Sequence, residues 1–253
     1  LQESRADCAI EIREIETTGD RRTVSGIPST NIGIFTSAIE ERLLAGDIDV
    51  AVHSMKDLPT EMPEGLTVAA VPQRSDVADV LVTDDGRSIA ELPENATVLT
   101  GSPRRKAQLR ERRPDLNVED IAGNVPTRLQ KLQSSEAAAL VLAAAGLKRL
   151  GLAEGKTHRL EPGGFVPSPG QGALAVQVRK DDANAVQACA EIDHRASRLT
   201  VTAERAMLAE LGAGCSVPAG GYARFRAAGS GLVLTGMVGS PEGHPLVKDT
   251  TNQ

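Results

Sequence analysis

The order of apolar and polar positions predicts a chain in which short strands alternate with helices. Stretches typical of strands lie at residues 9–15, 48–52, 66–71, 80–83, 98–100, 116–121, 138–143 and 173–179. Helical segments are predicted to begin near Ser37, Ser102 and Pro126. The strand–helix alternation predicts an α/β fold with mostly parallel sheets and helices on both faces.

Local signals predict where several helices begin and end. Ser37 and Glu40 have the spacing of a capping box, and Gly46 follows as a helix terminator. Ser102 is a suitable N-cap, and Pro103 suits the first helical turn.

The second half of the chain predicts a separate α+β unit. A Pro- and Gly-rich linker spans residues 161–172, and a long amphipathic helix is predicted over residues 197–211. Antiparallel strands are predicted within 222–238. The polar turn at residues 92–96 is interpreted as a crossing point between two domains.

Composition excludes several classes of function. The chain has 253 residues, 40% hydrophobic and 25% charged, with no apolar run long enough to span a membrane. The net charge of −6, with one tyrosine, three phenylalanines and no tryptophan, argues against a nucleic-acid partner. Three cysteines without a CxxC pair argue against a disulfide framework or a zinc site, so we expect a reducing cytoplasm and no metal.

One thiol stands out from the other two. Cys215 lies among glycines at 212, 214, 220 and 221, which allow a bulky group to approach the main chain closely. A cysteine at the end of a helix is more often a small buried hydrophobe. The glycine density favours a thiol that carries a bound group. Its reactivity would depend on the thiolate, which nearby cations stabilise.

Cations are concentrated in residues 101–131, which contain eight basic residues and four acidic ones. Arg104 and Arg105 fall in the first turn of a predicted helix, and Arg128 near the start of another. The helix dipole already attracts anions there, so these three arginines indicate a carboxylate or phosphate ligand. Three others, Arg110, Arg112 and Arg113, are interpreted as a solvated helix face.

A second candidate lies after the strand at 48–52. Lys56 either binds an anionic substrate or pairs with Asp57 or a neighbour, and the spacing does not separate these alternatives. His53 is interpreted as structural. Asp76 and Asp79 flank a turn into the next strand, where an acid is more often a turn-former than a catalyst.

These blocks together resemble one family, hydroxymethylbilane synthase, also called porphobilinogen deaminase. The motifs that carry the resemblance stand in family order: AVHSMKDLPTEMPEGL (51–66), TGSPRRKAQL (100–109), GNVPTRLQKL (123–132), AAGLKRLGL (144–152), PGQGALAVQVR (169–179), VTAERAML (201–208) and GAGCSVPAGGYA (212–223). The resemblance covers about residues 17–222, and several of its motifs are long enough to be specific.

The resemblance implies three domains. Residues 1–94 with about 173–190 would form a first lobe, residues 97–168 a second, both like the lobes of periplasmic binding proteins, and residues 195–253 a cofactor-tethering α+β domain. It also implies an amino-terminal strand before Leu1 and a longer carboxyl end. We expect a monomer.

The implied activity is a transferase of heme and tetrapyrrole biosynthesis. It condenses four porphobilinogen molecules head to tail with loss of ammonia and releases hydroxymethylbilane. The chain grows on a dipyrromethane cofactor held covalently through a thioether to Cys215, without metal.

The resemblance also implies roles for individual residues. Asp79 matches the catalytic aspartate, which would stabilise the cationic azafulvene left by loss of ammonia. Carboxylates of cofactor and substrate would be held by arginines. The other implied site residues are, for the cofactor, Lys56, Thr100, Ser102, Arg104, Arg105 and Arg128, and for the substrate, Arg149 and Gln171.

The chain departs from the family pattern at two cations. Ile32 stands where the family has a lysine, and Ala122 stands where it has an arginine. These losses favour an alternative, a degenerate two-lobed module that binds a small carboxylate ligand without turnover. A third hypothesis, a cysteine peptidase or thiol redox protein, would need a histidine or second cysteine near Cys215, for which the sequence offers no signature.

Overall fold

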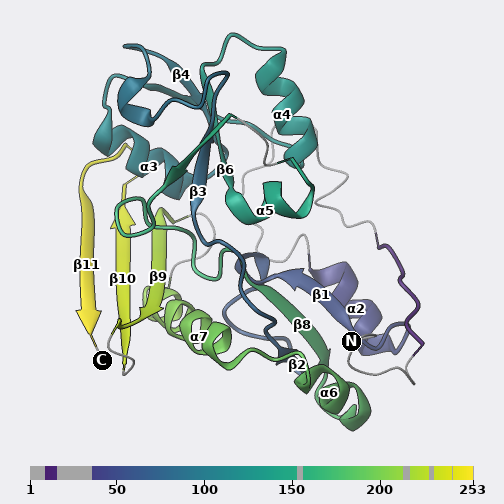
Figure 1. Cartoon of the computed structure of the whole chain (residues 1–253). Coiled ribbons are helices and arrows are strands. Elements are labelled where there is room, and N and C mark those ends of the chain that lie inside the picture. The colour runs from purple at the N-terminus through teal and green to yellow at the C-terminus, as the bar shows by residue number, and fades with distance from the viewer. Residues whose placement is uncertain are drawn as a thin grey trace.

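The fold contains three β-sheets with helices packed against them (Figure 1). It was obtained as a computed structural model, and it describes residues 9–15, 36–152, 156–212, 217–227, 231–240 and 242–252. The α/β fold predicted from the sequence, with a separate carboxyl-terminal unit, is confirmed.

The first lobe is built on a three-stranded sheet with the order β1-β8-β2, and both ladders are antiparallel. Helices α2 and α6 lie against this sheet (Figure 1). Its elements are α2 (Ser37–Ala45), β1 (Ala51–Ser54), the 3-10 turn η1 (Met55–Asp57), β2 (Leu66–Ala70), β8 (Leu174–Arg179) and α6 (Ala183–Ala190).

The second lobe is built on a five-stranded sheet with the order β5-β4-β6-β3-β7. Strand β4 is parallel to β5 and β6, as the strand–helix alternation predicted, whereas β3 is antiparallel to β6 and β7. Its elements are β3 (Asp79–Val82), η2 (Ile89–Glu91), β4 (Thr97–Leu99), α3 (Pro103–Arg112), β5 (Asn117–Glu119), α4 (Val125–Gln133), β6 (Ala139–Ala143), α5 (Ala144–Arg149) and β7 (Thr157–Leu160).

The third unit combines one long helix with an antiparallel sheet of order β11-β10-β9. Helix α7 (Arg195–Glu210) packs against β9 (Ala219–Phe225), and the sheet continues through β10 (Leu232–Gly239) and β11 (Leu246–Asn252). Gly221 and Gly236 let α7 approach the sheet, because a Cβ at either would meet the side chain of Met207.

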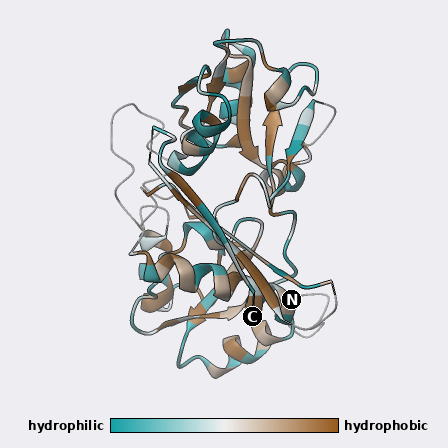
Figure 2. Ribbon diagram, turned by 90° about the vertical axis from the view of Figure 1, so that its left-hand side faces the viewer, coloured by the Kyte–Doolittle hydropathy of each residue, from teal (hydrophilic) through white to brown (hydrophobic). Residues whose placement is uncertain are grey.

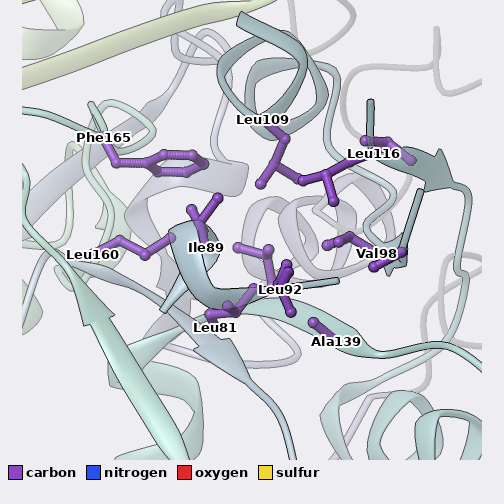
Figure 3. Close-up of a cluster of buried hydrophobic side chains, with 12 residues drawn as sticks. Leu81, Ile89, Leu92, Val98, Leu109, Leu116, Ala139, Leu160 and Phe165 are labelled. Atoms are coloured by element: carbon purple, nitrogen blue, oxygen red, sulfur yellow. The ribbon is translucent and has the colours of Figure 1, made fainter. Parts of the chain in front are cut away.

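Apolar residues fill both faces of the five-stranded sheet. Leu81 of β3 and Ala139 of β6 belong to a cluster that also contains Leu109 and Phe165 (Figure 3). Their strand neighbours, such as Val80 and Leu140, belong to a cluster on the opposite face. Figure 2 shows the resulting hydrophobic strands inside the lobes. A strand buried on both faces is a rigid support for the residue at its end.

Two crossing segments join the lobes and lie side by side. The segment between β2 and β3 meets the one between β7 and β8, where Ser75 N–H donates to Gly172 O at 3.1 Å. Gly172 has a φ of +83°, and a Cβ there would lie 2.7 Å from Asp76 O, so a side chain would force the segments apart. The predicted crossing at residues 92–96 is therefore wrong, because β3 already belongs to the second sheet.

Two other local predictions fail for stated reasons. Residues 9–15 form no strand: Ile12 is 86% exposed, and none of the described strands pairs with the segment. Ser37 and Glu40 form no capping box: Thr36 is the N-cap, and the Glu40 side chain points into the first lobe, where it accepts a hydrogen bond from Gln177. Gly46 does end α2, in the left-handed conformation.

Within the described residues, no helix is both long enough and apolar enough to cross a membrane.

Candidate functional site

Asp79 organises the centre of the site from the first position of β3. Its Oδ2 accepts from Arg104 Nη1 at 2.7 Å, and its Oδ1 accepts from Arg105 Nη2 at 2.7 Å and Nε at 3.0 Å. Both arginines lie in the first turn of α3, as predicted. Their remaining bonds to carbonyl groups, Arg104 to Val166 O and Arg105 to Val141 O, fix the two guanidinium groups in place.

The Asp79 carboxylate is fully enclosed, with 0% of its side chain exposed. Burial alone would raise the pKa of Asp79, but the charges and hydrogen bonds of Arg104 and Arg105 hold it well below its ordinary value. Asp79 therefore stays ionised, and its charge compensates the buried charges of Arg104 and Arg105. It does not reach solvent.

Gln171 adds a fourth hydrogen bond to the same carboxylate. Its Nε2 donates to Asp79 Oδ1 and to Val77 O, both at 2.9 Å. Its Oε1 is buried and has no hydrogen-bond partner among the described residues. An unsatisfied buried acceptor costs about 1–3 kcal/mol, so this oxygen is suited to an N–H donor supplied from outside the protein.

Lys56 and Asp57 lie in η1, directly after β1. Neither side chain makes a hydrogen bond or ion pair in the part of the chain that the structure describes. Burial lowers the pKa of Lys56, which also feels the charges of Asp57, Arg105 and Asp79. Asp57 is exposed as a whole residue, and burial on the protein side of its carboxyl group raises its pKa against the opposing charges of Lys56 and His53.

Arg128 and Arg149 border the same region without an acidic partner among the described residues. Arg128 Nε donates to Gly123 O at 2.6 Å, and burial together with the nearby Arg105 lowers its pKa. Arg149, at the end of α5, donates from Nη2 to Gly172 O at 3.0 Å, and burial lowers its pKa. Both guanidinium groups therefore keep donors for a ligand carboxylate.

Thr100 and Ser102 lie where β4 leads into α3. Thr100 is fully buried, and its Oγ1 accepts from Ser102 N–H at 3.3 Å. Ser102 is the predicted N-cap, but its side chain makes no capping hydrogen bond, which leaves the hydroxyl available. These residues shape the first turn that carries Arg104 and Arg105.

Three residues singled out from the sequence need a separate statement. Cys215 and Ile32 lie outside the described residues. Ala122 is exposed at the loop before α4, and its carbonyl accepts from Lys131 Nζ at 3.0 Å. Of the predicted solvated face, Arg112 is exposed and lies over the Phe165 ring, 5.2 Å from its centroid, whereas Arg113 is partly buried and pairs with Asp115.

Sequence reasoning missed a buried ion pair that ties α7 to this site. Arg74 Nη1 and Nη2 donate to Glu204 Oε1 and Oε2, each at 2.8 Å, and Arg74 Nε donates to Gln171 O at 2.9 Å. Glu204 also accepts from the backbone N–H groups of Gly170 and Ala223. The two residues are 130 positions apart in the sequence, so no local pattern could have revealed the ion pair.

Comparison with known proteins gives a consistent result. The family model described as "Porphobilinogen deaminase, dipyromethane cofactor binding domain" matches residues 1–187, and "Porphobilinogen deaminase, C-terminal domain" matches residues 198–253. The chain is 47% identical over 243 residues to porphobilinogen deaminase of Shouchella clausii, covering 94% of this chain and 77% of the relative. It is 48% identical over 245 residues to that of Rubrobacter xylanophilus, covering 95% and 78%.

Among solved structures, a putative methionine-binding lipoprotein from Bacillus subtilis is similar with a TM-score of 0.40 and 15% identity, covering 60% of this chain and 72% of that one.

Proposed function

The chain belongs to the porphobilinogen deaminase family, and we propose that the residues around Asp79 perform that family's reaction. It is a transferase of tetrapyrrole synthesis that condenses four porphobilinogen molecules head to tail, with loss of ammonia, on a dipyrromethane cofactor to give hydroxymethylbilane.

The observation that carries the proposal is the excess of cations at one site. Lys56, Arg128 and Arg149 have no acidic hydrogen-bond partner among the described residues, and Asp79 serves two further arginines. Porphobilinogen carries acetate and propionate groups, so a growing oligopyrrole presents many carboxylates. Guanidinium groups bind carboxylates in a bidentate manner, which matches this surplus to the substrate class.

The same residues fit the dipyrromethane cofactor. Its carboxylates suit Lys56 and Arg128, which have no acidic partner among the described residues. Its pyrrole N–H groups suit the buried Gln171 Oε1 and the exposed Asp57 carboxylate. When bound, the cofactor supplies the anchored pyrrole to which further units are added. Cys215 is proposed as its tether, on the sequence argument.

The two aspartates of the site are suited to different tasks. Asp79 makes four hydrogen bonds and has no exposed surface, so its proposed task is to hold Arg104 and Arg105. Asp57 is exposed and has no hydrogen-bond partner among the described residues, and its pKa is raised, which suits a group that exchanges a proton or stabilises a developing cation. We therefore propose Asp57 as a second acid of the site, beside Asp79, which stays the aspartate proposed as catalytic from the sequence.

Several coarser expectations remain proposals. Three separate sheets support a division into three domains. Residues 71–78 and 161–173 join the two lobes. A protein that acts in the cytoplasm and binds no nucleic acid is proposed from the composition, and a monomer from the family resemblance.

Intact-mass measurement tests the tether and the cofactor together. We expect purified protein to carry an adduct equal to two pyrrole units, which Cys215→Ser removes. Turnover of porphobilinogen then distinguishes an active enzyme from a module that binds without reacting. Protein that carries no adduct, or an adduct retained in Cys215→Ser, would contradict the proposal.

A further inference from the structure

A buried glutamine one helical turn after Arg104 binds the segment that joins the two lobes. Gln108 of α3 is 1% exposed, and its side-chain amide pairs with the backbone of Val166 in both directions. Gln108 Oε1 accepts from Val166 N–H at 2.7 Å, and Gln108 Nε2 donates to Val166 O at 3.0 Å. A backbone N–H only donates and a carbonyl oxygen only accepts, so these two contacts also fix which way the amide points.

The same carbonyl group of Val166 holds Arg104. Arg104 Nη1 donates to Val166 O at 2.8 Å and to Asp79 Oδ2 at 2.7 Å. Residues 104 and 108 are four positions apart, so their side chains lie on one face of α3 and can share this acceptor. Val166 O is therefore one of the two acceptors that orient the Arg104 guanidinium.

The opposite edge of the Arg104 guanidinium is open. Neither Nε nor Nη2 of Arg104 has a hydrogen-bond partner among the described residues, although Arg104 is only 4% exposed. Arg105, in contrast, donates from Nε, Nη1 and Nη2. The Nε–Nη2 edge of a guanidinium binds a carboxylate in a bidentate manner. The direction in which Arg104 presents this edge depends on the two acceptors at Nη1.

Strand β9 of the third unit supports Val166 from another side. A Cβ at Gly220 would lie 3.0 Å from Val166 O, and Gly221 N–H donates to Pro167 O at 2.9 Å. Val166 is fully buried. Because β9 limits how far the segment can move, we expect a variant of Gln108 to fold, with a small shift of Val166.

We propose that Gln108 is a positioning residue for ligand binding by Arg104. Among the described residues, Gln108 Oε1 is the acceptor for Val166 N–H, and without it this buried N–H would have to find another partner. The resulting shift of Val166 would move an acceptor of Arg104. The inference rests on the proposed function, in which Arg104 binds a carboxylate of the oligopyrrole. The holding of Arg104 by Gln108 and Val166 does not depend on that function.

Side-chain nitrogen NMR on the full chain with 15N-labelled arginine measures how firmly Arg104 is held, without any assay of activity. A guanidinium held at Nη1 rotates slowly about its C–N bonds. We expect slow exchange of the Arg104 Nη signals in the parent and exchange about ten-fold faster in Gln108→Met, the factor that corresponds to one lost hydrogen bond. Arg104→Lys identifies the signals by their disappearance.

Gln177→Met provides the matched control. Gln177 of β8 is 0% exposed and makes side-chain hydrogen bonds within the first lobe, so its loss also removes a buried amide. The Arg104 signals should stay unchanged in this variant. The same exchange rate in the parent and in Gln108→Met, whether slow or fast, would overturn the positioning role.

Gln108→Glu is the second variant, for the case that Gln108→Met does not fold. Its carboxylate still accepts from Val166 N–H but, when ionised, has no hydrogen to donate to Val166 O. We expect faster exchange of the Arg104 Nη signals in this variant than in the parent. An unchanged rate in folded Gln108→Glu would contradict the role of the shared carbonyl group.

A double-mutant cycle tests the link to the ligand. Arg104→Lys keeps a positive charge beside Asp79 and lacks the Nε–Nη2 edge. We expect Gln108→Met to lower kcat/KM for porphobilinogen about ten-fold in the parent and less than about two-fold in the Arg104→Lys background, because the two residues act as a unit. Gln177→Met should lower stability and leave kcat/KM unchanged in both backgrounds.

Equal factors for Gln108→Met in the two backgrounds would show that Gln108 does not act through Arg104, and would overturn the proposal. If the parent protein does not turn over porphobilinogen at all, the proposed function fails. The NMR result then still decides whether Gln108 holds Arg104.

Discussion

Asp79 and Asp57 lie in the same site and differ in almost every physical respect. The Asp79 carboxylate accepts four hydrogen bonds from two arginines and a glutamine, and it is fully buried. Asp57 makes no side-chain hydrogen bond to any described residue and reaches solvent. The pKa of Asp79 is lowered and that of Asp57 is raised. A saturated buried anion organises structure, and an open one remains available for chemistry.

Asp79→Asn should cause the largest change, and it should appear in stability. The substitution leaves Arg104 and Arg105 buried without their anion, and breaking a buried ion pair from one side costs about 3–5 kcal/mol. Urea denaturation at pH 7 measures the loss. The salt bridge between Arg159 and Asp76 provides a matched control, because Asp76 is partly exposed and Asp76→Asn should cost about 1 kcal/mol or less.

The pH dependence of stability sharpens the same contrast. Because the folded-state pKa of Asp79 lies below its unfolded value of about 3.9, its contribution is complete above that value. The contribution is lost as pH falls from about 4 toward the folded pKa. Denaturation at pH 7, 5, 4 and 3 should therefore show a steeper acid loss in the parent than in Asp79→Asn. Parallel curves would contradict the low pKa.

Asp57→Asn should instead leave stability nearly unchanged and remove activity. An exposed side chain without a hydrogen bond contributes within about 0.5 kcal/mol to stability, whereas a group that moves a proton or stabilises charge contributes about 10²–10³-fold to kcat. Single-turnover kinetics with porphobilinogen measure the second quantity. If Asp57→Asn kept normal turnover while a folded Asp79→Asn lost it, Asp79 alone would be the catalytic aspartate, as predicted from the sequence.

The acidic limb of the pH–rate profile offers a separate check on Asp57. Its carboxylate must be ionised to stabilise a cation, so activity should rise with pH through a pKa above the ordinary aspartate value.

Which parts of this site could be predicted from sequence depends on the range of the interactions. Arg104, Arg105 and Arg128 were found from helix-start signals, because Ser102, Pro103 and Pro126 act within one turn. The hydrogen-bond donors that distinguish Asp79 from Asp57 come from distant segments of the chain. Gln171 lies 92 positions from Asp79, so the sequence could not show that Asp79 is saturated.

The same reasoning explains the errors in the fold. Strand β3 is as apolar as β2, so the pattern could not show that the chain crosses between lobes at residues 71–78 and not at 92–96. Glu40 fits a capping box by spacing, but its carboxylate finds Gln177, 137 positions away. Local patterns fixed most helix and strand positions correctly, and long-range polar contacts decided what the side chains do.

Arg128→Met tests the open side of the site at the level of binding. The substitution keeps much of the apolar stem and removes a guanidinium whose hydrogen bond within the described chain goes to Gly123 O. Losing one charged contact to a carboxylate should weaken binding by about ten-fold, which corresponds to roughly 1.5 kcal/mol. We expect KM for porphobilinogen to rise and kcat to change less. Arg113→Met, which breaks the bond to Asp115, should lower stability and leave KM unchanged.

Ala122→Arg should produce the smallest effect and in the opposite direction. Ala122 is exposed at the loop that begins α4, and Lys131 already places an ammonium 3.0 Å from its carbonyl oxygen. A new arginine adds a donor for ligand carboxylates, but the Lys131 ammonium already supplies a positive charge there. We therefore expect KM to fall by only about two- to three-fold. In a Lys131→Met background the same substitution should help more, because the competing cation is absent. Equal gains in both backgrounds would show that Lys131 does not serve the ligand, and no gain in either would show that position 122 lies outside its reach.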